Sequence, residues 1–206
     1  MKNPFALANR SLRDTGGAVK SAQMVRVIAP SEWHGKATVA LARALLGKVL
    51  VRTYADGTRE SRVILETEAY VGTHDLACHA SKGCTPRTQV MFGPGGVWYV
   101  YLCYGIHEML NLVTGPAGRP AAILIRGVEG AIGPGRVTKQ LGIDRRLNAR
   151  LAAPTSGLHL EDHGIVAPRK HIIVGPRVGI DYAGPIWAAK PWRFRIAPEN
   201  LRCEPA

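Results

Sequence analysis

Short segments of strand length, separated by turns rich in glycine and proline, occupy most of this chain and restrict its fold more than any other feature. Lys48–Thr53 and Ser61–Tyr70 flank the turn Ala55–Gly57, a pattern typical of a β-hairpin. Further strands are expected at Val97–Cys103, Ile106–Thr114 and Ala121–Val128, and near His171–Val174 and Trp192–Ile196. Hairpin-joined strands form antiparallel sheets, so the pattern argues against a doubly wound parallel fold.

Helices are expected between these strands. Ala37–Leu46 is rich in alanine and leucine, and Gly47 follows where a helix commonly ends. Thr85-Pro86 predicts the start of a short helix that reaches about Phe92, and Gly133-Pro134-Gly135 predicts one that reaches about Leu141. The mixture indicates an α+β fold in a single domain.

The first residues differ in composition from the rest. Residues 1–29 carry Lys2, Arg10, Arg13, Lys20 and Arg26 against the single acid Asp14, with no sustained apolar period. We expect a basic, flexible arm over 1–29 and the folded domain over 30–206. An acid-poor start also resembles an organelle transit peptide, but a basic tail is the preferred interpretation.

The charge of the chain favours a polyanionic partner. Lysine and arginine number 27 against 15 acids, which gives a net charge of +12. Nucleic acid is the first candidate, an anionic membrane surface or acidic protein the second, and a merely basic or ribosome-associated protein the plain alternative. No apolar run approaches the roughly 18 residues of a spanning helix, so we expect no membrane segment.

The cysteines predict free thiols in a reducing compartment. Cys78 and Cys84 do lie near His74 and His79 in the sequence, which raises the question of zinc. No CxxC and no second ligand pair at the usual spacing accompanies them, so no metal is expected.

Two carboxylates and an aromatic residue share one face of the strand Ser61–Tyr70. The period of two places Glu66, Glu68 and Tyr70 together. A carboxylate in a pocket can deprotonate water, but a solvated glutamate and an arginine ion pair explain the spacing equally well. Paired glycosidase acids are less favoured, because neighbours on one strand face lie about 7 Å apart along one chain rather than on both sides of a sugar.

Aromatic and basic residues add weaker signals. Tyr99, Tyr101 and Tyr104 could stack on bases or a cationic ligand, with core packing as the alternative. The helix start at Gly133–Arg136 suits a phosphate, although many helices start after Gly-Pro. Arg145–Arg150 adds three arginines that could also contact phosphate, and a solvated helix face explains them equally well. No GxSxG is present, and Lys82 is the only lysine in 64–111, so covalent catalysis has no obvious nucleophile.

Several segments, in order and with their spacing, match one family. They are Glu66–Tyr70 (ETEAY), Ala77–His79, Thr85–Arg87, Met91-Phe92, Tyr99–Gly105 (YVYLCYG), Asn111, Ala121–Arg126 (AAILIR), Gly133–Arg136 and Pro176–Ile180 (PRVGI). From about Pro30 to Ile196 the chain therefore resembles the alkyladenine, or 3-methyladenine, DNA glycosylases of the mammalian-type fold. The resemblance implies a curved, mostly antiparallel sheet with surrounding helices and a DNA-binding face that carries a protruding tyrosine hairpin.

The resemblance also implies a function. The implied protein is a monofunctional DNA glycosylase of base excision repair. It flips alkylated or deaminated purines of the 3-methyladenine, 7-methylguanine and hypoxanthine class out of double-stranded DNA and removes them by hydrolysis. No cofactor, no metal and no membrane is implied, and a monomer is expected. We expect the protein to be located in the cytoplasm of a bacterium, associated with the nucleoid, or in an organelle or the nucleus of a eukaryote.

Residue roles follow from the same resemblance. Glu68 looks like the water-activating carboxylate and Arg126 like its partner, whereas Glu66 is expected to be structural. The remaining roles are pocket walls (Tyr70, His79, Tyr101), a main-chain donor to the base (the amide of His79), exclusion of guanine (Asn111), intercalation (Tyr104) and phosphate contact (Arg87, Arg136).

Three departures from the family pattern accompany the match. Gly127–Gly130 follows Arg126 where a sequence nearer Ala-Leu-Glu-Pro is expected, His74 replaces an acid, and Glu108 replaces an aromatic residue. An acid at position 108 would repel phosphate. The alternative to an enzyme is a basic nucleic-acid-binding module of the same fold without catalysis, which would have no reason to keep both Glu68 and Arg126.

Overall fold

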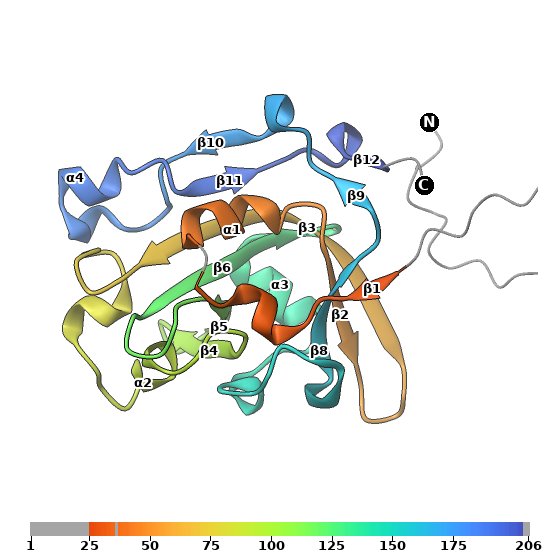
Figure 1. Ribbon diagram of the computed structural model, residues 1–206, viewed down its shortest axis with the longest axis horizontal. Coiled ribbons are helices and arrows are strands. Elements are labelled where there is room, and N and C mark those ends of the chain that lie inside the picture. The colour runs from red at the N-terminus through yellow and green to blue at the C-terminus, as the bar shows by residue number, and fades with distance from the viewer. Residues whose placement is uncertain (1–24, 36, 204–206) are drawn as a thin grey trace, which may run out of the picture.

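Strand β3 (Arg59–Val71) crosses the centre of a large antiparallel sheet (Figure 1). The computed structural model describes residues 25–35 and 37–203. Within these residues the sheet has ten strands, and seven of them follow one another in the order β1 (Arg26–Val27), β8 (Leu158–Asp162), β2 (Val49–Thr53), β3, β6 (Ala121–Val128), β5 (His107–Val113) and β4 (Trp98–Cys103).

Three more strands attach to the side of this path. Strand β11 (Arg193–Arg195) pairs with β3 and with β10 (Ile173–Gly175), and β7 (Ala131–Ile132) pairs with β6. A separate two-stranded sheet joins β9 (Ile165–Val166) to β12 (Arg202–Cys203). Because β11 and β6 both pair with β3 at residues 66–68, this part of β3 is held by a strand on each side.

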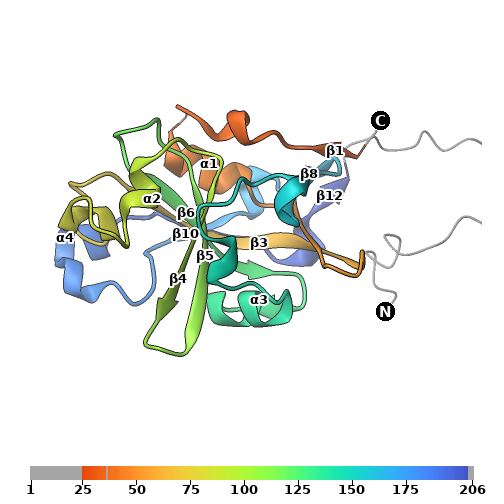
Figure 2. The ribbon, with the colours of Figure 1, turned by 90° about the horizontal axis from the view of Figure 1, so that it is seen from below.

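Four α-helices lie in the described part of the chain: α1 (Thr38–Ala44), α2 (Gln89–Phe92), α3 (Pro134–Gln140) and α4 (Pro185–Ala188). Helices α1 and α3 cover opposite faces of the central strands (Figure 2). Short 3-10 turns connect the elements: Pro30–Trp33, His79–Lys82, Arg145–Leu147, Pro154–Ser156, Arg169–His171, Asp181–Ala183 and Pro198–Asn200. None of the helices in the described ranges has the length and apolarity that a bilayer crossing requires.

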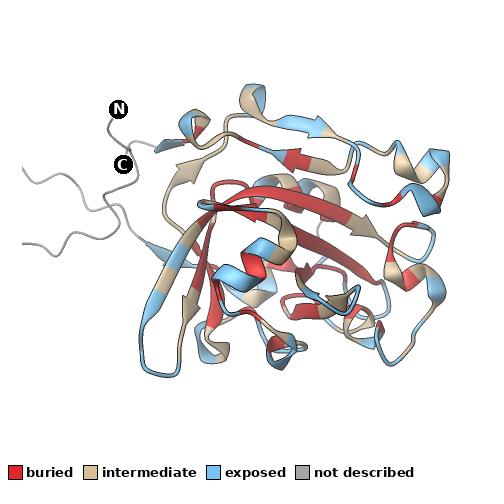
Figure 3. Ribbon diagram, turned by 180° about the vertical axis from the view of Figure 1, so that it is seen from behind, coloured by how far each residue is buried: buried red, intermediate tan, exposed pale blue. Residues whose placement is uncertain are grey.

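Both faces of β3 are buried from Val63 to Ala69, and Figure 3 shows this burial along the central strands. On one face the Thr67 hydroxyl donates a hydrogen bond of 2.7 Å to the Ala42 carbonyl of α1. The other face carries Glu66 and Glu68, which are 7% and 0% exposed. Burying two carboxylates is costly unless they are paired, so their partners decide what this face can do.

The α+β prediction with an antiparallel sheet is confirmed, and most element positions shift by only a few residues. The helix expected at Ala37–Leu46 is α1, and it ends before Gly47, which has φ +86 and donates its N–H to the Ile64 carbonyl at 3.0 Å. The helix expected to run from Pro86 to Phe92 is only Gln89–Phe92, since residues 86–88 form a turn.

The first strand and β8 were not predicted. Arg26–Val27 pairs with β8, so the last residues of the expected arm belong to the sheet, while residues 1–24 lie outside the described part. Strand β8 carries His159 and Glu161, which resemble solvent-facing residues in the sequence. Both are buried because they bind each other, with 2.9 Å between His159 Nε2 and Glu161 Oε1.

Candidate active site

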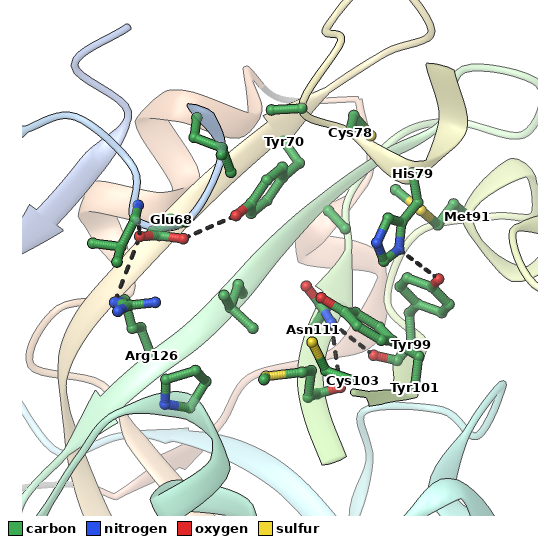
Figure 4. A pocket seen from close by; sticks show the side chains of 18 of the residues that line it. Glu68, Tyr70, Cys78, His79, Met91, Tyr99, Tyr101, Cys103, Asn111 and Arg126 are labelled. Carbon is green, nitrogen blue, oxygen red and sulfur yellow. Dashed lines mark hydrogen bonds and ion pairs between the residues drawn. The ribbon is translucent and has the colours of Figure 1, made fainter. Parts of the chain in front are cut away.

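A cavity of about 520 Å³ opens beside β3, β4, β5 and β6, and Figure 4 shows the side chains that line it. Its volume lies in the usual range of small-molecule sites. Eight of the nine residues for which the resemblance implies a role in the site line it together: Glu68, Tyr70, His79, Arg87, Tyr101, Tyr104, Asn111 and Arg126. Arg136 is exposed on α3 and is not part of the lining.

Glu68 lies fully buried at one side of the cavity with three partners. Its Oε2 accepts a hydrogen bond of 2.9 Å from the Tyr70 hydroxyl, and its Oε1 accepts one of 2.9 Å from the Val178 amide. Arg126 Nε lies 3.5 Å from the same Oε1. Burial raises the pKa of Glu68, and the Arg126 charge and the two hydrogen bonds only partly offset this rise. Such a carboxylate is a stronger base than an exposed one.

Glu66 has a different environment. Its Oε1 accepts a hydrogen bond of 3.1 Å from Arg126 Nε and lies 3.1 Å from Arg193 Nε. The pairing of β3 with β6 shifts register on each side of Glu66, which places Glu66 opposite Gly127. Bulges of this kind re-aim side chains beside functional sites. Glu66 is therefore held by two arginines, whereas Glu68 shares only Arg126 with it.

The register shift gives a physical reason for one departure from the family pattern. A Cβ atom added to Gly127 would lie 3.0 Å from Glu66 Cβ and 3.2 Å from Ile132 Cδ1. Both distances are tighter than ordinary van der Waals contact. Glycine at this position thus leaves room for the Glu66 side chain next to Arg126.

Aromatic rings form the opposite side of the cavity. The His79 and Tyr101 rings meet edge to face at 4.6 Å, and His79 Nδ1 lies 3.0 Å from the Tyr99 hydroxyl. Burial and then the Arg87 charge lower the pKa of His79 to about 4, so its ring is neutral near pH 7. Burial also raises the pKa of Tyr101, which keeps that phenol neutral. These walls are uncharged surfaces on which a flat ring can stack.

Asn111 lies in the wall of the cavity and is 4% exposed. Its Nδ2 donates hydrogen bonds to the Tyr99 carbonyl at 3.1 Å and the Met109 carbonyl at 3.4 Å. Because two main-chain acceptors hold the amide nitrogen, the orientation of this side chain is fixed.

Tyr104 stands at the turn of the β4–β5 hairpin, which projects from the rest of the domain in Figure 2. It is 88% exposed and has φ +50, followed by Gly105 at φ +70. The Ile106 amide closes the turn on the Cys103 carbonyl at 3.1 Å. A bulky side chain with positive φ is strained, and such strain persists mainly where function requires it.

Arg87 also differs from a simple surface cation. Its guanidinium lies 4.8 Å from the centre of the Tyr101 ring, at the rim of the cavity.

Glu108 is less repulsive to phosphate than its charge implies, because Arg145 Nε lies 3.0 Å from Glu108 Oε1. His74 packs against Trp187, with 5.7 Å between ring centres.

Three features of the site were not found in the sequence. The first is the Val178 amide, which a sequence cannot reveal because every residue except proline has a main-chain N–H. Tyr182 lines the cavity and donates its hydroxyl to the Ala77 carbonyl at 3.1 Å. The third is a buried ion pair between Asp75 and Arg177, which lie 102 positions apart in the sequence. The sequence signal for both Val178 and Arg177 was only their place in the matching segment Pro176–Ile180.

The cysteines and a metal site were a further question. Cys78, Cys84, Cys103 and Cys203 are all free thiols, and burial raises the pKa of Cys78 to about 12. Among the described residues, no group of three or more histidine, cysteine, aspartate or glutamate side chains could hold a metal ion.

A cavity with a buried carboxylate and aromatic walls is a candidate active site, and the net charge of +12 attracts polyanions such as nucleic acid. The family model of the methylpurine-DNA glycosylases (MPG) matches residues 32–132 and 128–200. The chain belongs to this family. It is a DNA glycosylase, a hydrolase of N-glycosidic bonds in base excision repair.

Relatives in three bacteria support the assignment, and each carries the name "Putative 3-methyladenine DNA glycosylase". The protein of Myxococcus xanthus is 48% identical over 177 residues, which cover 81% of this chain and 89% of the relative. That of Anaeromyxobacter dehalogenans (strain 2CP-C) is 46% identical, with 86% and 87% covered. That of Psychrobacter cryohalolentis is 40% identical, with 85% and 93% covered.

Proposed function

We propose that this DNA glycosylase removes alkylated or deaminated purines from double-stranded DNA by hydrolysis, with Glu68 activating the attacking water. The observation that carries the proposal is the Glu68 carboxylate, which is fully buried, faces the cavity and keeps a cation, a hydroxyl and an amide as partners. The substrates are 3-methyladenine, 7-methylguanine and hypoxanthine, and the partner is a DNA duplex.

The chemistry requires one proton transfer to the protein. Glu68 accepts a proton as the water oxygen bonds to the anomeric carbon of the sugar, and the bond from that carbon to the purine breaks. A purine that is cationic through alkylation takes both electrons of this bond and leaves as a neutral base. Hypoxanthine starts neutral, so it takes the same two electrons and a proton from solvent water. Arg126 holds the water and the carboxylate together. Because water and a carboxylate suffice, the reaction needs no metal or cofactor, and one monomer contains the whole site.

Base recognition follows from the aromatic part of the cavity. The target nucleotide leaves the duplex, at a cost of a few kcal/mol that damaged pairs reduce. Tyr70, His79 and Tyr101 contact the flipped base, the His79 amide donates to it, and Asn111 excludes guanine. Tyr104 fills the space left in the duplex, as inserted side chains do in other DNA-bending proteins. Arg87 and Arg136 contact phosphates.

The test compares base release by the wild type with that by Glu68→Gln. The substrates are alkylated duplex DNA and a duplex with a single hypoxanthine, and both assays contain EDTA. Glu161→Gln is a matched control, because Glu161 is also a buried carboxylate on a strand of the sheet, with Arg59, His159 and His163 as partners. We expect release by the wild type and Glu161→Gln, and a loss of roughly 100- to 10,000-fold in Glu68→Gln.

Two outcomes contradict the proposal in different ways. Full activity of Glu68→Gln would exclude the water-activating role of this carboxylate. No release by the wild type from any damaged purine would favour the alternative, a nucleic-acid-binding module without catalysis. The reaction should also leave an intact abasic strand, because no amine forms a Schiff base with the sugar.

A further inference from the structure

An ion pair between Asp75 and Arg177 is buried directly behind the cavity. Both side chains are 0% exposed, and Arg177 donates two hydrogen bonds, of 2.6 Å and 2.9 Å, to the two oxygens of Asp75. Neither residue lines the cavity. Taking two charges out of water is costly and is offset only by good geometry and further hydrogen bonds. The other contacts of the pair therefore show what it holds in place.

Three separate segments meet at this pair. Arg177 also donates to the Ala69 carbonyl at 2.9 Å, one residue past Glu68 on β3. Asp75 accepts hydrogen bonds of 3.1 Å each from the amides of Val71 and Ala77. The pair thus connects the end of β3, the segment that leads to His79, and the segment that contains Val178.

The Arg177 guanidinium also lies between two aromatic rings. It is 4.7 Å from the centre of the Tyr70 ring and 5.0 Å from that of Trp192. A cation over an aromatic face is attracted to it, more strongly when both are removed from water. The Tyr70 ring is therefore held from behind, and its hydroxyl donates to Glu68.

The residue after Arg177 donates the second of the two hydrogen bonds that Glu68 accepts. The Val178 amide lies 2.9 Å from Glu68 Oε1, so its position depends on where the Arg177 main chain is fixed. Both hydrogen bonds to the carboxylate thus come from groups that contact Arg177, one through its ring contact and one through the adjacent peptide.

We propose that Asp75 and Arg177 are positioning residues that hold the Tyr70 hydroxyl and the Val178 amide on the carboxylate of Glu68. The proposal rests on the proposed role of Glu68 in hydrolysis. A donor to a carboxylate stabilises its ionised form, so displacement of these donors raises the proton affinity of Glu68. We expect an upward shift of about one pH unit in the titration of Glu68, since a hydrogen bond to a charged group has roughly this effect.

The test measures this titration directly in the free protein, by NMR of ¹³C-labelled glutamate carboxyl groups. The variants are Asp75→Asn, which keeps the shape of the side chain, Arg177→Lys, which keeps the charge, and Trp192→Leu, which loosens Arg177 without leaving a charge unpaired. Glu161→Gln is again the control, because it removes a buried carboxylate on β8. Its stability should fall, whereas its Glu68 titration should stay at the wild-type position.

Base release against pH provides the second measurement. In Asp75→Asn and Arg177→Lys the acidic limb of kcat/KM should move up with the NMR titration, and kcat should fall by up to about 10-fold at pH values on that limb, with little change in KM. Trp192→Leu should show a smaller shift in the same direction. Thermal unfolding will show whether Asp75→Asn and Arg177→Lys fold. If they do not, the inference is tested with Trp192→Leu.

The outcomes separate this inference from the proposed function. A Glu68 titration that stays in place in every folded variant would overturn the positioning role, even if base release fell. If the wild type releases no base, the proposed function fails, but the NMR titration still decides whether the pair controls Glu68. A shift of the same size in Glu161→Gln would also overturn the inference, because any loss of stability would then suffice.

Discussion

The strained turn at Tyr104 predicts a substitution that raises stability and lowers activity. Tyr104 and Gly105 have φ of +50 and +70, as in the hairpin turn for which Asn-Gly is the preferred pair. A left-handed conformation costs a bulky residue about 1–2 kcal/mol, and asparagine tolerates it better. Tyr104 is 88% exposed, so Tyr104→Asn loses little buried area. We expect the free energy of unfolding to rise by about 1 kcal/mol.

The same substitution should slow repair of duplex DNA. Stacking of an aromatic side chain on a base contributes roughly 1–3 kcal/mol, so its loss should lower base release from a duplex by roughly 5- to 150-fold. Release from a single strand should change far less, because no stack has to be replaced there.

Ala149 offers a matched control. It also has positive φ, +61, and is exposed, but it lies outside the hairpin and the cavity lining. Ala149→Asn should therefore raise stability and leave base release unchanged. The assays are thermal unfolding, in which 1 kcal/mol corresponds to about 2–4 °C for a domain of this size, and single-turnover base release. A less stable Tyr104→Asn, or one that loses equal activity on both substrates, would refute the reasoning.

Three further predictions concern pH, the core and DNA affinity. The acidic limb of base release should lie above pH 4.5, the ordinary pKa of glutamate, because burial raises the pKa of Glu68. A limb at or below pH 4.5 would contradict this. His79 should add no step between pH 5 and 8, because its pKa is about 4. Phe194→Ala should lower the free energy of unfolding by about 3–5 kcal/mol in chemical denaturation, since that ring is 0% exposed between β3 and the Arg43 side chain of α1. Arg136→Ala should weaken duplex binding equally for all sequences and reduce the salt slope by about one; an unchanged slope would exclude a phosphate contact.

The fold was largely predictable because the strands beside the cavity are rich in branched and aromatic side chains. Ala121–Val128 was predicted with the bounds that β6 has, since all but one of its residues are apolar or glycine. Strand β8 was missed because the buried pair His159 and Glu161 gives it the pattern of a solvent-facing segment. A sequence pattern records the polarity of residues, but not whether their partners are buried with them.

The candidate site was predictable only in part, for a similar reason. Spacing alone left Glu66 and Glu68 equivalent, and the resemblance separated them. In the structure Arg126 Nε is 3.1 Å from Glu66 and 3.5 Å from Glu68, while only Glu68 has the Val178 amide. Residues far apart in the sequence supply these contacts, and one of them is main chain. Neither property can be read from the local residue pattern.

The ion pair between Asp75 and Arg177 also affects how this sequence can change over generations. Loss of either partner leaves a buried charge at a cost of about 3–5 kcal/mol, a large part of the 5–15 kcal/mol that stabilises a typical domain. A lineage that replaces one residue must therefore pass through a poorly folded ancestor or change both positions nearly together. The two sites, 102 positions apart, are expected to be inherited as a unit.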